Sequence, residues 1–194
     1  MITMNLRRAL VFLGLLAGIA SVLYACADEG TSDMLELNTT AKIDLQRYMG
    51  AWYVIANIPY FAERGKVATR DVYKLDADGN VDTTYVYRKT FDSPEKTMSS
   101  LGVVQSGSDN ARWVVRLLWL FRADYLVLEV APDYSWALVG QPNRKLAWVF
   151  ARNPAMDDAL YTTLLEKFRS YGYDPAKFMR VPQFKEQVGK PGFQ

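Results

Sequence analysis

The sequence predicts an all-β domain: an eight-stranded antiparallel up-and-down β-barrel with one C-terminal α-helix packed outside it. Three observations support this prediction. Eight apolar runs follow one another, separated by short segments rich in Gly, Pro, Asp and Asn. One amphipathic helical stripe comes after the last run. The chain has 194 residues, of which 50% are hydrophobic, enough for one domain with a sizeable core.

Residues 1–25 are predicted to be a lipoprotein signal peptide. Arg7 and Arg8 provide a basic start, and residues 9–25 form a largely apolar run. This run is short for a membrane span of ~20 residues and is typical of the apolar core of a signal peptide. The alternative is an uncleaved anchor helix followed by a chance cysteine.

The end of this segment resembles the lipobox of bacterial lipoproteins. Leu23 lies three residues before Cys26 and the small Ala25 lies directly before it, with a bulky Tyr24 between them. The resemblance implies that Cys26 becomes the acylated first residue of the mature chain, and several acyl chains anchor a protein stably. Because Ala27 follows the cysteine in place of Asp, the resemblance implies sorting to the outer membrane.

Residues 26–41 are predicted to be the acylated N-terminus and a polar, acidic tether, and residues 42–194 the folded domain. The net charge of +2 comes from Arg7 and Arg8, because the other 21 basic residues balance 21 acidic ones. This balance gives no electrostatic case for binding nucleic acid.

Period-two alternation and turn residues set the predicted strand boundaries. Asp78-Gly79 marks a tight turn between the second and third strands. Short connections favour antiparallel neighbours, and eight such strands close into a barrel that has no exposed edge and can hold one small ligand. The predicted strands are residues 52–58, 67–75, 81–89, 97–105, 113–117, 125–130, 136–139 and 146–151.

A helix is predicted after the strands. Asn153 is a suitable N-cap and Pro154 suits a first turn, while Asp157 and Asp158 lie where the helix dipole favours acids. Gly172 is expected to end the helix. The apolar stripe expected to pack on the outside of the barrel consists of Tyr161, Leu164, Leu165, Phe168 and Tyr171.

Three short motifs resemble those of the lipocalin family, and specifically of its bacterial lipoprotein members. The first strand starts with G-x-W, an Asp-Tyr pair precedes the seventh strand, and an Arg ends the eighth. The segment "FAERG" and the ending "YGYDPAKFMRVPQ" also resemble family segments, and the match runs from about residue 44 to residue 183. The motif residues are Gly50, Trp52, Asp133, Tyr134 and Arg152.

The resemblance implies a calyx in which these motifs meet at the closed end of the barrel. Arg152 would pack over the Trp52 indole, a contact that contributes about 0.5–2 kcal/mol, and both residues would be structural. The mouth would lie at the other end, in loops 59–66, 91–96, 118–123 and 141–145. Its predicted residues are Phe61, Arg64, Trp119, Phe121, Arg122 and Arg144.

The predicted cavity wall comes from alternation and, in part, from the family. Alternation against outward Arg88 and Arg116 places six residues inside: Tyr73, Tyr85, Tyr87, Trp113, Val115 and Leu117. The resemblance adds three more: Tyr125, Val127 and Trp136. Asp71 shares the parity of Tyr73, so either a carboxylate faces the cavity or the register shifts locally. The apolar loop "LWLFRA" is either an inward strand extension, a greasy cavity entrance, or a partner or dimer surface.

An aromatic pocket with a few hydroxyls suits a long apolar ligand with a polar head. Bacterial members of the family are thought to bind fatty acids or lysophospholipids. The prediction is therefore an envelope lipoprotein, anchored in the bacterial outer membrane and facing the periplasm, that stores or transports such a ligand. A homodimer is compatible with the sequence.

Catalysis is not expected. The chain has no histidine, and its one cysteine is the predicted acylation site, so the commonest general base and zinc ligands are missing. We expect no metal and no cofactor. The alternatives are a structural or assembly lipoprotein whose barrel is filled by its own side chains and, less favoured, a lipocalin-fold enzyme.

Overall fold

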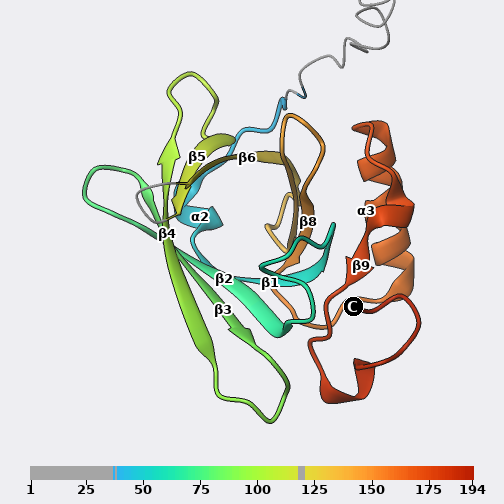
Figure 1. The fold of residues 1–194 in the computed structure, drawn as a ribbon. Coiled ribbons are helices and arrows are strands. Elements are labelled where there is room, and N and C mark those ends of the chain that lie inside the picture. Colours follow the sequence, from blue (N-terminus) through green and yellow to red (C-terminus); the bar gives the residue numbers. More distant parts are fainter. Residues whose placement is uncertain (1–36, 38, 118–120) are drawn as a thin grey trace, which may run out of the picture. The chain divides into compact units, whose positions relative to one another are not determined.

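The computed structural model describes residue 37 and residues 39–117 and 121–194, which contain a closed antiparallel barrel (Figure 1). Consecutive strands pair from β2 to β8, and β1 pairs with both β8 and β2, so the ring closes. The predicted fold class is confirmed. The strands are β1 Gly50–Asn57, β2 Val67–Leu75, β3 Val81–Arg88, β4 Lys96–Val104, β5 Arg112–Leu117, β6 Phe121–Val130, β7 Trp136–Gly140 and β8 Ala147–Ala151.

The predicted signal peptide and Cys26 lie outside the described residues. Within the described part of the chain, no helix has the length and apolar character needed to cross a membrane.

The start of β6 differs from the prediction. The strand begins at Phe121 rather than Tyr125, because residues 121–124 continue the ladder with β5, pairing Leu117 with Phe121 and Val115 with Ala123. The "LWLFRA" segment is thus partly a strand extension. Its Phe121 ring is nevertheless 62% exposed instead of packing inward.

Helix α3, Asp158–Ser170, starts later than predicted. The Asn153 side chain accepts a hydrogen bond from the Ala155 N–H two residues on, which holds a turn and keeps Pro154 outside the helix. The N-cap is Asp157, whose Oδ1 accepts from the Leu160 N–H at 2.9 Å. Gly172 follows the helix with φ of 80°, in the left-handed region that favours glycine, so the predicted end is confirmed.

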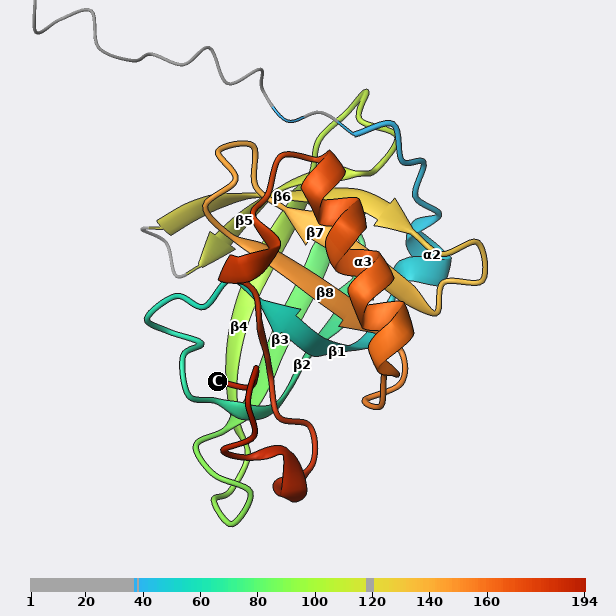
Figure 2. The same ribbon diagram turned by 90° about the vertical axis from the view of Figure 1, so that its right-hand side faces the viewer.

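The apolar stripe of α3 packs on the outside of the barrel, where Figure 2 shows the helix lying across β7 and β8. Leu164 and Phe168 are fully buried against outward residues such as Leu138 and Val149. Beyond the helix, the Tyr173 hydroxyl is fixed against β7, donating to the Gln141 carbonyl and accepting from the Gln141 N–H.

One end of the barrel is closed by the short helix α2, Leu45–Tyr48. Its N-cap, Asp44, accepts hydrogen bonds from two backbone N–H groups of its first turn. The Tyr48 ring is fully buried and lies 5.0 Å from the Trp52 ring and 5.6 Å from the Trp113 ring, centroid to centroid. The Trp52 indole donates to the Tyr48 carbonyl at 2.7 Å, which fixes the helix to β1.

Arg152, at the end of β8, completes this closed end. Its guanidinium carbon lies 3.8 Å from the centroid of the Trp52 ring. The same guanidinium donates to three carbonyls at 2.7–2.8 Å, those of Arg47, Met49 and Ala51. Gly50 has φ of 94°, and a Cβ there would lie 3.4 Å from Arg152 Nη1. Glycine therefore suits both the backbone turn and the close approach of the arginine.

The Asp133-Tyr134 pair lies at this end as well. Asp133 accepts from the Ser135 N–H, holding the turn between β6 and β7. Tyr134 has φ of 62°, and its hydroxyl accepts from the Asp44 N–H at the start of α2. The Arg47 guanidinium lies 4.1 Å from the centroid of the Tyr134 ring. All three motifs therefore meet at the end of the barrel that α2 closes.

The C-terminal segment braces the other end of β1, which the sequence did not predict. A short strand, β9 (Met179–Arg180), pairs with β1 between the 3₁₀ turns η1 (Pro175–Lys177) and η2 (Lys185–Gln187). The buried Gln183 side chain donates to the carbonyls of Val54 and Thr69, which lie on β1 and β2. It thereby bridges the strands beyond the point where their own ladder stops.

Gly140→Ala should destabilise the domain. An added Cβ would lie 2.1 Å from the Tyr173 hydroxyl oxygen, which its two bonds to Gln141 hold in place. Overpacking of this kind costs about 1–3 kcal/mol, which lowers Tm by roughly 3–10 °C in thermal unfolding followed by circular dichroism. In a Tyr173→Phe background the same substitution should cost less. Equal costs in both backgrounds would contradict this account.

Trp52→Ala should destabilise the domain more than Trp136→Ala. Trp52 is fully buried beneath Arg152, whereas Trp136 is half-buried on the outer face. Removing a buried Trp costs about 3–5 kcal/mol, and here it also leaves the Arg152 guanidinium without its ring. Denaturant unfolding of the two variants tests the difference. Similar losses would show that Trp52 does not close the core.

Candidate functional site

The barrel encloses a cavity of about 370 Å³. Two aromatic rings at its rim are strongly exposed, Phe61 in the β1–β2 loop at 92% and Phe121 at the start of β6 at 62%. In Figure 2 the β1–β2 and β7–β8 loops lie on the left, at the opposite end from α2. The cavity therefore opens at the end predicted to be the mouth.

Six of the nine residues predicted for the wall line this cavity. They come from β2, β3, β5 and β6: Tyr73, Tyr85, Trp113, Val115, Leu117 and Tyr125.

Three predicted wall residues lie elsewhere. Val127 is fully buried in the core at the closed end. Tyr87 stacks on Tyr85 and lies under the Lys66 ammonium, outside the cavity lining. Trp136 is on the outer face, 5.8 Å from the Lys167 ammonium of α3, because inward Ala137 and Val139 alternate with it along β7. These three residues do not line the cavity of this structure.

Only some of the predicted mouth residues line the rim of the cavity. Phe61, Phe121 and Arg122 line the rim. Arg64 is exposed beside it. Arg144 instead donates to the Tyr171 carbonyl at 2.8 Å, at the C-terminal end of α3, where a cation satisfies unpaired helix carbonyls. Trp119 lies outside the described residues.

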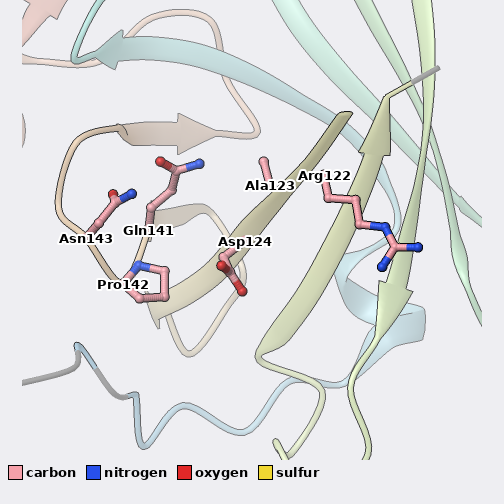
Figure 3. A pocket seen from close by; sticks show the side chains of 6 residues that line it. All are labelled: Arg122, Ala123, Asp124, Gln141, Pro142 and Asn143. Carbon is pink, nitrogen blue, oxygen red and sulfur yellow. The ribbon is translucent and has the colours of Figure 1, made fainter. Parts of the chain in front are cut away.

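The rim includes a second, polar hollow of about 330 Å³, between the start of β6 and the β7–β8 loop (Figure 3). Gln141 and Asn143 stand on one side of it and Asp124 on the other, while the Arg122 side chain points away from them. Asp124 forms an ion pair with Arg112 at 3.3 Å. Gln141, Asp124 and Arg122 line the main cavity as well, so its edge is polar on this side.

Two carboxylates face the cavity. Glu63, in the β1–β2 loop, is 9% exposed, and its Oε2 accepts from the Asn57 amide at 2.6 Å and the Trp148 indole at 2.9 Å. Asp71, on β2, accepts from the Tyr73 hydroxyl at 3.0 Å. Burial raises the pKa of Glu63 to about 7, and burial together with the charge of Glu63 raises the pKa of Asp71 to about 7.

The alternatives left open for Asp71 both apply. The β2–β3 register shifts between Val67 and Arg70, where Ala68 has φ of 51° and donates its N–H to the Pro182 carbonyl. Beyond this bulge the ladder is regular, so Asp71 and Tyr73 both point inward.

A row of tyrosine hydroxyls runs from the cavity lining, at Tyr73 and Tyr125, to Tyr48 in the core beneath it. The Tyr48 and Tyr125 oxygens are 2.9 Å apart, the Tyr125 and Tyr73 oxygens 3.0 Å apart, and Tyr73 donates to Asp71. Burial raises the pKa of all three phenols, so they stay neutral at physiological pH. The floor of the cavity is therefore polar and hydrogen-bonded beneath an aromatic and aliphatic wall.

A family model described as a lipocalin-like domain matches residues 43–183. The chain belongs to the lipocalin family. Temperature-induced lipocalin-1 of Arabidopsis thaliana is 33% identical over 158 residues, 76% of this chain and 83% of that protein. Outer membrane lipoprotein Blc of Escherichia coli strain K12 is 29% identical over 144 residues, 72% and 79% of the two chains.

Solved structures agree on the fold. Apocrustacyanin C2 has a TM-score of 0.61 with 17% sequence identity, over 79% of this chain and 87% of its own. At that identity the likeness concerns the lipocalin barrel alone.

Local sequence patterns do not predict several residues that line the cavity of this lipocalin. Glu63 lies in the "FAERG" loop, and no local pattern shows that a loop glutamate folds inward onto Asn57 and Trp148. Strand β8 is apolar on both faces, so alternation does not show which of its residues point inward. Trp148 and Phe150, which line the wall, are therefore not predicted. The polar Thr83 and Ser100 could have been found by extending the β3 alternation across the β3–β4 register.

Asp71→Asn should change how stability depends on pH. A carboxyl with a folded-state pKa near 7 and an unfolded-state value near 3.9 binds more protons when folded, so its contribution to stability is fully present below pH ~4 and is lost as pH rises to ~7. The free energy of unfolding of the variant minus that of wild type should therefore be larger at pH 8 than at pH 4.5. The expected increase is about 1 kcal/mol or more, which corresponds to about 2–4 °C in Tm.

The matched control is Asp82→Asn, at an exposed position on neighbouring β3. Calorimetry of both variants at the two pH values provides the comparison. A gain for Asp71→Asn that is the same at pH 4.5 and pH 8 would refute a buried, ionising carboxyl.

Proposed function

We propose that this protein is an envelope lipoprotein that binds a lipid, such as a fatty acid or lysophospholipid, in its barrel for storage or transport. The observation that carries the proposal is the cavity of about 370 Å³, which has an apolar wall, a polar floor and exposed aromatic rings at its rim. Sites for small apolar molecules share this design, with a few placed polar groups among hydrophobic side chains. Lipocalin family membership points to the same ligand class.

The subcellular location in this proposal is the bacterial outer membrane, where the protein is anchored through acylated Cys26 with its barrel facing the periplasm. The lipobox resemblance and the names of relatives support it, since outer membrane lipoproteins of Escherichia coli and Vibrio cholerae are 29% and 24% identical to this chain. Lipocalins of a plant and a virus are among the relatives too, so this location rests mainly on residues 1–27.

A binding role is also favoured over a filled structural barrel. In a filled barrel the wall residues would contact one another across the axis, whereas Val115, Leu117 and Tyr125 border open space.

Native mass spectrometry of the full-length protein, purified from a bacterial envelope in non-ionic detergent, tests the proposal. A co-purifying fatty acid or lysophospholipid on the wild type is expected. Val115→Trp places a large ring in the cavity and should abolish the adduct. The matched control is Val114→Trp, one residue along β5 and outside the lining, which should keep it. An adduct unaffected by Val115→Trp would mean that the lipid binds elsewhere.

A further inference from the structure

The two cavity carboxylates lack the partners that buried acids usually have. Among the described residues, no Lys or Arg forms an ion pair with Asp71 or Glu63. Each accepts hydrogen bonds on one oxygen only, Oδ2 of Asp71 and Oε2 of Glu63. Within the described part of the chain, no group donates to the second oxygen of either carboxylate. Buried charges without a partner are costly.

A second observation independently indicates a polar ligand group in the same space. The Tyr85 side chain lines the cavity and is only 8% exposed, and its buried hydroxyl oxygen makes no hydrogen bond of standard geometry among the described residues, where the Thr69 side chain offers only a weak interaction. Tyr85 faces Asp71 across the β2–β3 ladder, where the two residues are paired. A buried hydroxyl normally has a partner, so the lack of a standard hydrogen bond here marks a position where a ligand atom would complete the bonding.

We propose that Asp71 and Glu63, with the Tyr85 hydroxyl, form a cation-recognising subsite inside the barrel, which takes the ammonium group of an amphiphile whose alkyl chain lies against the apolar wall. An ammonium has three N–H donors and no acceptor, which matches two carboxylates and a phenol oxygen. Its hydrogen bonds to the carboxylates would be charge-assisted. A carboxylate or phosphate placed there would meet two like charges.

This inference rests on the proposed function, because it names the part of the ligand that the lipid-binding cavity selects. Among the lipids considered, it favours one with an amino head group over a fatty acid held by its carboxylate in the same position. A fatty acid would keep its carboxylate at the rim, where Arg122 lies.

Asp71 and Glu63 are the cavity groups expected to set how ligand binding depends on pH, because the phenols around them stay neutral. The hydroxyls of Tyr48, Tyr60, Tyr73, Tyr85 and Tyr125 approach the pair from α2, the β1–β2 loop, β2, β3 and β6, and burial raises the pKa of each phenol. They are neutral between pH 6 and pH 8. At the rim, Arg122 and Asp124 carry opposite charges. Lys66 lies over the Tyr87 ring, outside the lining.

The test uses three probes that differ only in the head group, namely dodecylamine, dodecanol and dodecanoate. Each is titrated into the full chain in non-ionic detergent, and the singly bound fraction is measured by native mass spectrometry. At pH 8, dodecylamine should bind about 10–100-fold more tightly than dodecanol, the ratio expected for charge-assisted hydrogen bonds. Dodecanoate should bind no more tightly than dodecanol. Because an alkylamine titrates near pH 10.4, only the carboxyls lose charge on going to pH 6, where amine binding should fall about tenfold.

Variants test whether Asp71 and Glu63 cause the preference for dodecylamine over dodecanol. Asp71→Asn combined with Glu63→Gln should bring dodecylamine to within about threefold of dodecanol, because the neutral amides remove the two negative charges that attract the ammonium. Asp71→Glu keeps a carboxylate and should keep a preference, and the exposed control Asp82→Asn should behave as wild type. Circular dichroism establishes that each variant is folded.

The outcomes separate the two proposals. If wild-type protein binds dodecanol or dodecanoate as tightly as dodecylamine, or if the preference survives in the folded double variant, the cation subsite is refuted and lipid binding stands. If none of the three probes binds wild type more than it binds Val115→Trp, the cavity is not a binding site and the proposed function itself fails.

Discussion

Arg152 satisfies three backbone carbonyls where the chain passes from α2 into β1. The Trp52 ring supports the guanidinium from below. Because this contact fixes α2 across the end of the barrel, it also fixes Tyr48, whose hydroxyl lies beneath the cavity and hydrogen-bonds to that of Tyr125 in its lining.

The cavity lining is apolar along its wall and polar near the closed end. Val115 and Leu117 form an aliphatic wall, whereas Asp71 and the tyrosine hydroxyls near the closed end form a polar layer. A polar layer at the bottom of an apolar pocket requires a rigid support, since each hydroxyl must be held within hydrogen-bond distance of the next. The rigid closed end supplies that support, and the loop that carries Glu63 supplies the second carboxylate.

The sequence predicted the parts of this structure that local patterns encode. Alternation along β3 and β5 identified Tyr85, Trp113 and Val115, because polar residues mark the outer face of those strands. Alternation assigns no face to Trp136, because β7 is apolar on both faces where α3 covers the outer one; only the family resemblance placed this residue in the wall. The inward fold of Glu63 and the capping of α3 by Asp157 depend on contacts distant in sequence or on competing turns, which no periodicity records.

The tyrosine row has a direction. Each phenol has one hydrogen to donate, and Tyr73 gives its own to Asp71, so Tyr125 must donate to Tyr73 and Tyr48 to Tyr125. The three O–H dipoles therefore point the same way, toward the carboxylate. Protonation of Asp71 would remove the charge that orders them, and the row could then reverse. The ionisation state of one cavity residue is in this way transmitted to α2, at the far end of the barrel from its mouth.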